Sequence, residues 1–124
     1  MKPMAGKKIL VVDDEKLLRE ILRDEFSEFE GATCEEAASA KEALVLLKKT
    51  EFDIVISDIR MPDGDGLSLL DSILALPRRP MVFFCTGYSD LTREEALRRG
   101  ARDLFYKPFD PSVVAAAVKK AFFR

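Results

Sequence analysis

The amino-acid sequence predicts an α/β fold in which a parallel β-sheet is covered by helices on both faces. Five short apolar segments recur along the 124 residues, and each is followed by a polar turn and then by apolar residues at helical spacing. The segments contain few polar residues, as expected of strands that are buried on both sides. The length fits one domain with its own hydrophobic core.

The first half of the chain contains two of these strand–helix units. Residues 9–12 predict a buried strand, and the acidic residues 13–15 follow at the expected start of a helix. Gly31 suits the left-handed position after that helix, and residues 32–36 predict a weaker strand. Residues 39–42, Ser-Ala-Lys-Glu, have the form of a capping box that opens a second helix. The apolar face of the first helix is expected to comprise Leu18, Ile21, Leu22, Phe26 and Phe29.

The second half contains three more units. Their strands are rich in β-branched or aromatic residues and are expected at residues 52–57, 81–85 and 104–106. The helices are expected at residues 67–74, at residues 91–99 with Leu91, Ala96 and Leu97 as a short apolar face, and from Pro111 onward. Asp110 suits the N-cap of the last helix and Pro111 its first position. The sequence thus predicts five strands that alternate with five helices.

The composition excludes several classes of protein and kinds of chemistry. The 20 Lys and Arg residues nearly balance the 22 Asp and Glu residues, so no strong field would hold nucleic acid or an anionic membrane. No apolar run approaches the length of a membrane span, about 20 residues. Two cysteines make no disulfide framework, which favours the cytoplasm. Because histidine is absent, the chemistry depends on carboxylates, hydroxyls, lysine or cysteine.

Residues able to bind a metal ion or a phosphoryl group follow four of the five predicted strands. Asp13 and Asp14 come after the first strand, Asp58 after the third, Thr86 after the fourth and Lys107 after the fifth. In doubly wound sheets, ligands bind at the carboxyl ends of the strands, near the point where strand order reverses. Three carboxylates held together there repel one another, and a divalent cation such as Mg²⁺ relieves the repulsion. One carboxylate could then act as a nucleophile towards phosphorus.

Each of these residues also has a simpler structural interpretation. Asp13 and Asp14 could cap the first helix, where acidic residues are favourable. Asp58 and Thr86 could be ordinary loop residues, and Lys107 could be a solvated charge. The functional interpretation depends on the occurrence of all these residues together at four strand ends. Their order along the chain fits a single mechanism, the transfer of a phosphoryl group to a carboxylate with a divalent cation bound.

The same residues lie in four motifs that resemble the receiver domain of bacterial two-component response regulators. The motifs are Val11-Val12-Asp13-Asp14-Glu15, Ser57-Asp58-Ile59-Arg60-Met61-Pro62-Asp63-Gly64-Asp65-Gly66, Thr86-Gly87 and Lys107-Pro108-Phe109. The resemblance extends over residues 7–123 and implies a flavodoxin-like fold with five parallel strands in the order 2-1-3-4-5. It places a receiver domain at residues 7–124, after an N-terminal tail at residues 1–6.

The resemblance also implies a set of metal ligands. Asp14 and Asp58 would bind Mg²⁺ directly, and Asp13 would act mainly through water. The backbone carbonyl of Arg60 would complete the protein's share of the coordination sphere. Mn²⁺ could take the place of Mg²⁺.

Phosphoryl transfer involves three side chains by the same resemblance. Asp58 would be the phosphoacceptor, Thr86 would contact the phosphoryl group and move with it, and Lys107 would pair with it. The peptide bond between Lys107 and Pro108 would be cis, which is common enough for an X-Pro bond at a functional turn.

The implied function is that of a phosphoacceptor signalling module without an external turnover substrate, and therefore not of an enzyme. A sensor histidine kinase or a histidine phosphotransfer protein would donate the phosphoryl group. The acyl phosphate would shift the surface of the fourth helix, fifth strand and fifth helix between two states. That surface would act on a downstream protein or a fused output domain, and it could form a homodimer. Both a stand-alone receiver, like the chemotaxis regulator, and the N-terminal domain of a larger regulator fit the resemblance.

The sequence departs from the family's pattern at the fifth strand. Many receivers have Tyr or Phe three residues before the lysine, and this position is Leu104 here. Alternation puts Leu104 and Tyr106 on one face of the strand and Phe105 on the other. Since a leucine cannot swing a ring behind Thr86, the switch works either through loop motion alone or through a substitute aromatic residue, with Tyr88 as the first candidate.

Two large side chains border the expected site. Arg60 and Tyr88 come two residues after Asp58 and Thr86, respectively. Their bulk could obstruct the water that attacks an acyl phosphate, which predicts slow self-dephosphorylation. Alternatively, both side chains point into solvent and have no such effect.

Two other functions compete with the receiver interpretation. Phosphatases of the haloacid-dehalogenase class also use an aspartate at a strand end, but they normally carry a second acid where this chain has Arg60. The other alternative is a pseudo-receiver that binds partners without phosphorylation, although all the acceptor-site positions are filled. Cys34 and Cys85 are expected to be buried strand residues without a metal or redox role.

Overall fold

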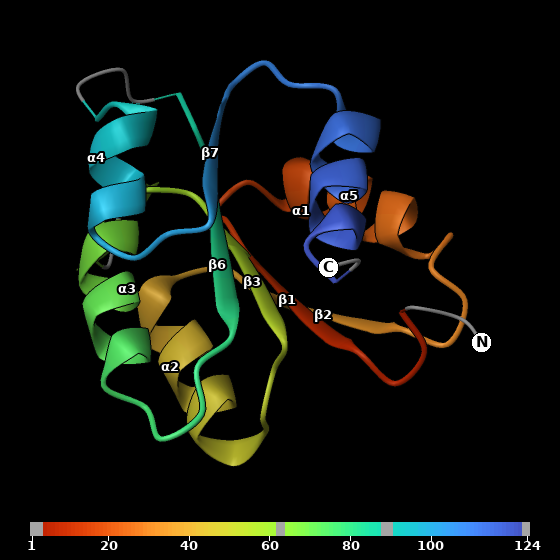
Figure 1. Ribbon diagram of the computed structural model, residues 1–124, viewed down its shortest axis with the longest axis horizontal. Helices are drawn as coiled ribbons and strands as arrows, with labels where there is room; N and C mark the ends of the chain where they lie inside the picture. Colours follow the sequence, from red (N-terminus) through yellow and green to blue (C-terminus); the bar gives the residue numbers. More distant parts are fainter. Residues whose placement is uncertain (1–3, 62–63, 88–90, 123–124) are drawn as a thin grey trace.

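The computed structural model describes residues 4–61, 64–87 and 91–122, and in them five parallel strands form one sheet (Figure 1). The strand order is β2-β1-β3-β6-β7, which confirms the predicted order 2-1-3-4-5 of the core strands. The strands are β1 (Lys8–Val12), β2 (Thr33–Ala37), β3 (Ile54–Ser57), β6 (Met81–Thr86) and β7 (Asp103–Tyr106). Strand order reverses between β1 and β3, so a ligand site is expected at their carboxyl ends.

Helices cover both faces of the sheet (Figure 1). On one face lie α1 (Lys16–Phe26) and α5 (Pro111–Lys120). On the other lie α2 (Ala40–Lys49), α3 (Gly66–Leu74) and α4 (Arg93–Arg98). None of the helices within residues 4–61, 64–87 and 91–122 has the length and apolar character that crossing a membrane requires.

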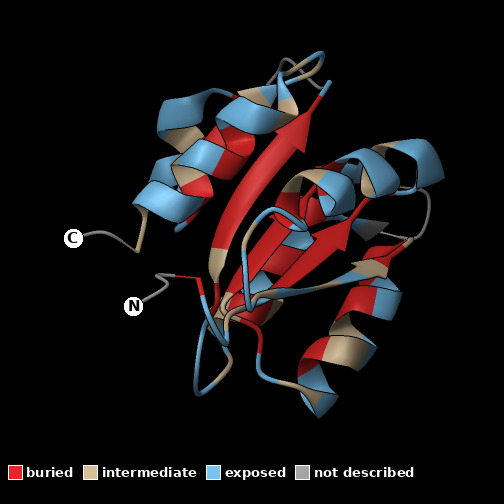
Figure 2. Cartoon of the chain, turned by 90° about the vertical axis from the view of Figure 1, so that its right-hand side faces the viewer, coloured by how far each residue is buried: buried red, intermediate tan, exposed pale blue. Residues whose placement is uncertain are grey.

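The core consists of two apolar layers, one on each face of the sheet. Leu10 and Val12 of β1 pack in the layer against α2, α3 and α4, whereas Ile9 and Val11 pack in the layer against α1 and α5. Side chains alternate between the two faces of a strand, and here both faces are covered, so all four residues are buried. Figure 2 shows the same burial along the strands of the sheet. This arrangement explains why the central strands β1, β3 and β6 are apolar almost throughout, whereas the edge strand β2 is not.

Polar side chains cap the starts of four helices. The residues that accept a backbone hydrogen bond there are Ser39 for α2, Asp65 for α3, Thr92 for α4 and Asp110 for α5. The predicted caps at Ser39 and Asp110 are therefore confirmed. Gly31 has a φ of 84°, which confirms the left-handed conformation expected after α1.

The first and fourth helices are shorter than the sequence predicts. Helix α1 ends at Phe26, and Phe29 follows it, with its ring packed edge-on against Phe26 at 5.5 Å between centroids. Helix α4 begins at Arg93 because Thr92 and Glu95 form a capping box there. Leu97, which its spacing placed on the short apolar face of this helix, is 44% exposed.

A small hairpin was not predicted. Strands β4 (Arg60–Met61) and β5 (Gly64–Asp65) pair antiparallel between β3 and α3. Two-residue strands carry no alternation pattern that a sequence could reveal. The prediction of a strand at residues 52–57 is also too long, because β3 begins at Ile54.

Candidate acceptor and metal site

The carboxyl ends of four strands bring the predicted site residues together. Asp13 directly follows β1, and Asp58 directly follows β3, which is its neighbour in the sheet. Thr86 is the last residue of β6, and Lys107 directly follows β7. Because the strands are parallel, these residues meet at one edge of the sheet.

Asp13, Asp14 and Asp58 form a cluster of carboxylates. One oxygen atom from each of the three lies within 4.8 Å of the others. Asp13 and Asp58 are buried, whereas Asp14 is exposed. A set of oxygen ligands that is open to solvent on one side fits a hard divalent cation that keeps several of its waters, as Mg²⁺ does.

The ammonium group of Lys107 lies among these carboxylates. Its Nζ atom is 3.0 Å from Oδ2 of Asp13 and 3.0 Å from Oδ2 of Asp58. It is also 3.3 Å from Oε1 of Glu15. Three acceptors match the three donors of an ammonium group. Lys107 is therefore an internal counter-cation of the cluster.

Backbone hydrogen bonds orient the two buried carboxylates. Oδ1 of Asp58 accepts the N–H of Ile59 at 2.7 Å. Oδ1 of Asp13 accepts the N–H of Glu15 at 2.9 Å. Each aspartate thus has one oxygen held by the backbone and the other shared with Lys107. The simpler interpretation of Asp13 as the N-cap of the first helix is wrong, because Glu15 occupies that position.

Burial and pairing shift the pKa values of Asp13 and Lys107. Burial raises the pKa of Asp13 above its ordinary value of 3.8, although hydrogen bonds from Glu15 and Lys107 oppose the shift. Burial would lower the pKa of Lys107, but hydrogen bonds to Asp58 and Asp13 outweigh it, and the net shift is upward. Lys107 therefore stays charged at neutral pH, and a bound cation would offset the cost of burying the Asp13 carboxylate.

Gly66 lets the loop after Asp58 fold back against its own strand. Its N–H donates to the carbonyl oxygen of Ile59 at 2.7 Å. A Cβ atom at this position would collide with the carbonyl oxygen of Asp58 and would lie 2.9 Å from Cε1 of Phe84. This close approach, rather than a positive φ, requires glycine.

Other predicted residues also lie near the strand ends. Thr86 is fully buried, and its carbonyl oxygen accepts the N–H of Lys107 at 2.8 Å. The peptide bond between Lys107 and Pro108 is cis, as expected. Arg60 begins β4 with an exposed side chain. Tyr88, the proposed substitute aromatic residue, lies outside the described residues.

Strand β7 confirms the alternation predicted for its side chains. Leu104 is buried in the layer against α2, α3 and α4, whereas Phe105 packs with the opposite layer. The Tyr106 hydroxyl donates to the carbonyl oxygen of Leu91 at 2.7 Å. Tyr106 thus ties the last strand of the sheet to the segment that leads into α4.

The two cysteines belong to strands of the sheet, Cys34 to β2 and Cys85 to β6. Burial raises the pKa of Cys85 to about 12 and that of Cys34 to about 11. Both thiols therefore stay protonated at neutral pH and are weak nucleophiles.

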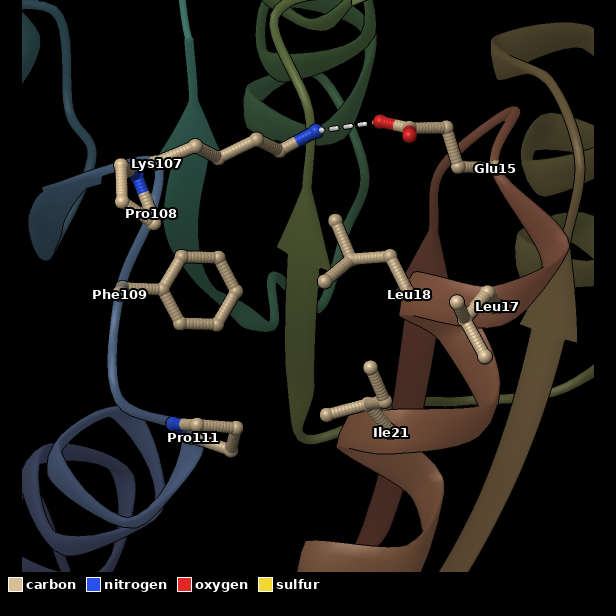
Figure 3. A pocket seen from close by; sticks show the side chains of 8 residues that line it. All are labelled: Glu15, Leu17, Leu18, Ile21, Lys107, Pro108, Phe109 and Pro111. Carbon is tan, nitrogen blue, oxygen red and sulfur yellow. Dashed lines mark hydrogen bonds and ion pairs between the residues drawn. The ribbon is translucent and has the colours of Figure 1, made fainter.

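A groove lies beside the site, between the start of α1 and the segment that joins β7 to α5 (Figure 3). Its volume is about 350 Å³. The apolar residues that line it are Leu17, Leu18, Ile21, Pro108, Phe109 and Pro111. Glu15 and Lys107 form its polar end, joined by their ion pair. Ile21, which its spacing placed on the apolar face of the first helix, is 38% exposed and lines this groove.

Sequence reasoning did not assign Glu15 to the site. Its position directly after Asp13 and Asp14, in the turn that enters α1, is the signal that could have identified it. A third acidic side chain there lies close enough to reach the lysine that follows β7, another strand of the same sheet.

Comparison with known proteins identifies the family and the fold. The family model of the response regulator receiver domain matches residues 9–119. Chemotaxis protein CheY from Thermotoga maritima is 32% identical over 116 residues, which cover 93% of this chain and 97% of the relative. The C4-dicarboxylate transport transcriptional regulatory protein DctD from Rhizobium meliloti is 39% identical over 119 residues, which cover 94% of this chain and 25% of the relative.

A solved structure with a bound metal ion is also similar. Response regulator protein TrrA from Thermotoga maritima, in complex with Mg²⁺ and BeF, has a TM-score of 0.80 and 34% sequence identity. The match covers 92% of this chain and 97% of that one. The chain therefore belongs to the response regulator receiver domain family, and Asp13, Asp14 and Asp58 form its acidic phosphoacceptor site.

Proposed function

We propose that Asp58 accepts a phosphoryl group from a phosphohistidine of a partner protein, with Mg²⁺ bound, and that the acyl phosphate switches a surface of the domain. The observation that carries this proposal is the placement of Asp58. Its Oδ1 is held by the backbone, while its Oδ2 faces Lys107 inside the carboxylate cluster. The 124 residues contain no histidine, so the donor histidine lies outside them.

The transfer step uses groups that already surround Asp58. A carboxylate oxygen of Asp58 attacks phosphorus while the phosphorus–nitrogen bond of the phosphohistidine breaks, and the released imidazole takes up a proton from solvent. The Lys107 ammonium, 3.0 Å from Oδ2 of Asp58, stabilises the negative charge on the transferring group. Thr86 supplies a hydroxyl for a second phosphoryl oxygen from the end of β6.

The three aspartates and one carbonyl group would hold the cation. Asp14 and Asp58 would bind it directly, Asp13 mainly through water, and Arg60 through its backbone carbonyl oxygen. Bound there, Mg²⁺ would neutralise both the carboxylates and the phosphoryl oxygens. The same hard oxygen ligands also suit Mn²⁺.

Phosphorylation would change the contacts of Thr86 and Lys107, which end β6 and follow β7. Both strands lead to the surface formed by α4, β7 and α5, which we propose as the output surface. Tyr106 joins β7 to the segment before α4 through its hydrogen bond to the Leu91 carbonyl oxygen. A displacement of β7 would therefore also displace the segment that leads into α4. The acyl phosphate would later hydrolyse, with no external substrate turned over.

The groove beside Lys107 is where the donor protein would dock. A donor histidine must come within bonding distance of Asp58, and Glu15 and Lys107 form the end of the groove that adjoins this residue. Leu17, 69% exposed, offers apolar surface that a partner could cover. A sensor histidine kinase or a histidine phosphotransfer protein is the partner that the chemistry requires.

Four further expectations stay predictions. They are a tail at residues 1–6 before a receiver domain at residues 7–124, a location in the cytoplasm, an output partner or fused output domain, and a homodimer that phosphorylation stabilises. Measuring the mass of the protein in solution with and without a phosphoryl mimic tests the last of these.

Binding of beryllofluoride, a phosphoryl mimic, tests the proposed acceptor. In the presence of Mg²⁺, we expect saturable changes in the amide NMR signals of residues at the four strand ends. A chelator should reverse these changes, and Asp58→Asn should abolish them. No binding to the wild type, or equal binding to Asp58→Asn, would overturn the proposal.

A further inference from the structure

Lys107 and a divalent cation would compete for the same oxygen atoms. Lys107 donates to Oδ2 of Asp13 and Oδ2 of Asp58, at 3.0 Å each. The Oδ1 atoms of both residues are held by backbone N–H groups. A cation that binds this cluster would therefore interact with the Oδ2 atoms to which Lys107 now donates. The Lys107 ammonium would then need other hydrogen-bond acceptors.

Glu15 is the one ion-pair partner of Lys107, among the described residues, that lies outside the carboxylate cluster. Its Oε1 is already 3.3 Å from the Lys107 Nζ. Its side chain is 65% exposed, so it can follow the ammonium at little cost. Figure 3 shows the Glu15 carboxylate reaching from the start of α1 towards Lys107 across the end of the groove.

We propose that Glu15 is a positioning residue that holds the Lys107 ammonium when a divalent cation occupies the cluster of Asp13, Asp14 and Asp58. The proposal rests on the proposed function, because it assumes that a cation occupies the cluster. Glu15 lowers the cost of releasing Lys107 from the two aspartates and keeps the ammonium beside Asp58, where the phosphoryl group would arrive. Glu15 thereby favours cation binding by acting on Lys107 rather than by touching the ion.

A double-mutant cycle on Mg²⁺ affinity, measured by calorimetric titration, tests this role. We expect Glu15→Gln to weaken Mg²⁺ binding about two- to fivefold, the range of one exposed ion pair. Lys107→Met should strengthen binding, because the competing ammonium is gone. In the Lys107→Met background, Glu15→Gln should then have little effect, since the residue through which Glu15 acts is absent.

Two further variants control for charge and for folding. Glu20→Gln removes the same charge from an exposed position of α1, and Glu20 is not a partner of Lys107. It should leave the Mg²⁺ affinity unchanged. Lys107→Gln provides a second background in case Lys107→Met does not fold.

A spectroscopic readout follows the ammonium itself. With lysine Nζ labelled with ¹⁵N and Mg²⁺ at saturation, we expect the Lys107 Nζ signal to persist in the wild type. In Glu15→Gln it should broaden through faster exchange with water.

The possible outcomes separate this proposal from the proposed function. Suppose that the wild type binds Mg²⁺ and that Glu15→Gln weakens Mg²⁺ binding equally with and without Lys107. Glu15 then does not act through Lys107. The same conclusion follows if Glu15→Gln does not change Mg²⁺ affinity in either background. The acceptor function would then stand without it. If the wild type binds no Mg²⁺, both proposals are overturned.

Discussion

At Gly66, a single added methyl group would press on the backbone of Asp58. We predict that Gly66→Ala lowers the free energy of unfolding by about 1–3 kcal/mol, as overpacking does. It should also weaken beryllofluoride binding, because the Asp58 carbonyl and the Phe84 ring must both move. Thermal unfolding and NMR titration measure the two effects.

Gly87 provides the matched control for this stability measurement. Among the residues that the structure describes, and apart from its chain neighbours, no atom lies within 4 Å of a Cβ atom placed there, and its φ is not positive. Gly87→Ala should change the unfolding free energy by less than about 0.5 kcal/mol. Equal losses for the two glycines would show that crowding at Asp58 is not the cause.

Arg60 tests how the acyl phosphate is protected from water. If the bulk of its side chain obstructs the attacking water, Arg60→Asn shortens the phosphoryl lifetime by about fivefold, or about 1 kcal/mol in the barrier. Tyr88→Glu should act in the same direction. Decay of the phosphorylated protein after the donor is removed provides the rate, and unchanged lifetimes would mean that neither side chain shields the phosphoryl group.

Single residues of the site were largely predictable, because each follows a strand that the apolar pattern reveals. Asp13, Asp14, Asp58 and Lys107 meet as predicted. The contact between Glu15 and Lys107 was not predictable, because it depends on the direction of one exposed side chain rather than on strand position. Sequence also could not show which oxygen of Asp58 the backbone holds.

Among the elements, α1 is fixed to the sheet by one glutamate of β2. Glu36 pairs with Arg19 at 3.1 Å and with Arg23 at 2.9 Å. Arg19 also donates to the carbonyl oxygen of Asp13 at 2.8 Å. This network sets the position of α1 relative to the acceptor site and to the groove.

We predict a pH-dependent effect when Glu36 is replaced. The hydrogen bond from Arg23 lowers the pKa of Glu36 below its ordinary value of 4.5. Its contribution to stability is therefore present above that value and is lost as the pH falls through the lower, folded-state pKa. Glu36→Gln should cost about 0.5–1 kcal/mol at neutral pH, and the difference from the wild type should disappear as the pH falls through the lowered pKa of Glu36.

Denaturant unfolding at several pH values checks this prediction. Glu35→Gln on the same strand is the control, because Glu35 is exposed and forms no ion pair among those described. If Glu36→Gln and Glu35→Gln behave alike, the arginine network does not stabilise α1.

At the level of elements, helix starts were easier to predict than surface features. Ser39 and Asp110 act as caps through local contacts that a short sequence encodes. The β4–β5 hairpin and the groove depend on how distant segments approach. Ile21 has the helical spacing of a core residue, yet it faces a groove whose other wall comes from residues 108–111.

In the whole molecule, the parallel strands of one sheet bring residues that are far apart in the sequence to one site. Asp13 and Lys107 are 94 residues apart in sequence but share a hydrogen bond, because β1 and β7 run parallel in one sheet. The apolar pattern predicted the sheet and its burial, whereas the order of the strands came from the resemblance to receiver domains. No local signal in the sequence specifies which strands are neighbours.

The most direct test of the central claim is the intact mass of the protein after incubation with acetyl phosphate and Mg²⁺. We predict that the wild type gains the mass of one phosphoryl group and that peptide mapping places it on Asp58. Neither Asp58→Asn nor the wild type with a chelator should gain this mass. A wild type that stays unmodified, or an Asp58→Asn variant that is modified equally, would contradict the assignment of Asp58 as the phosphoacceptor.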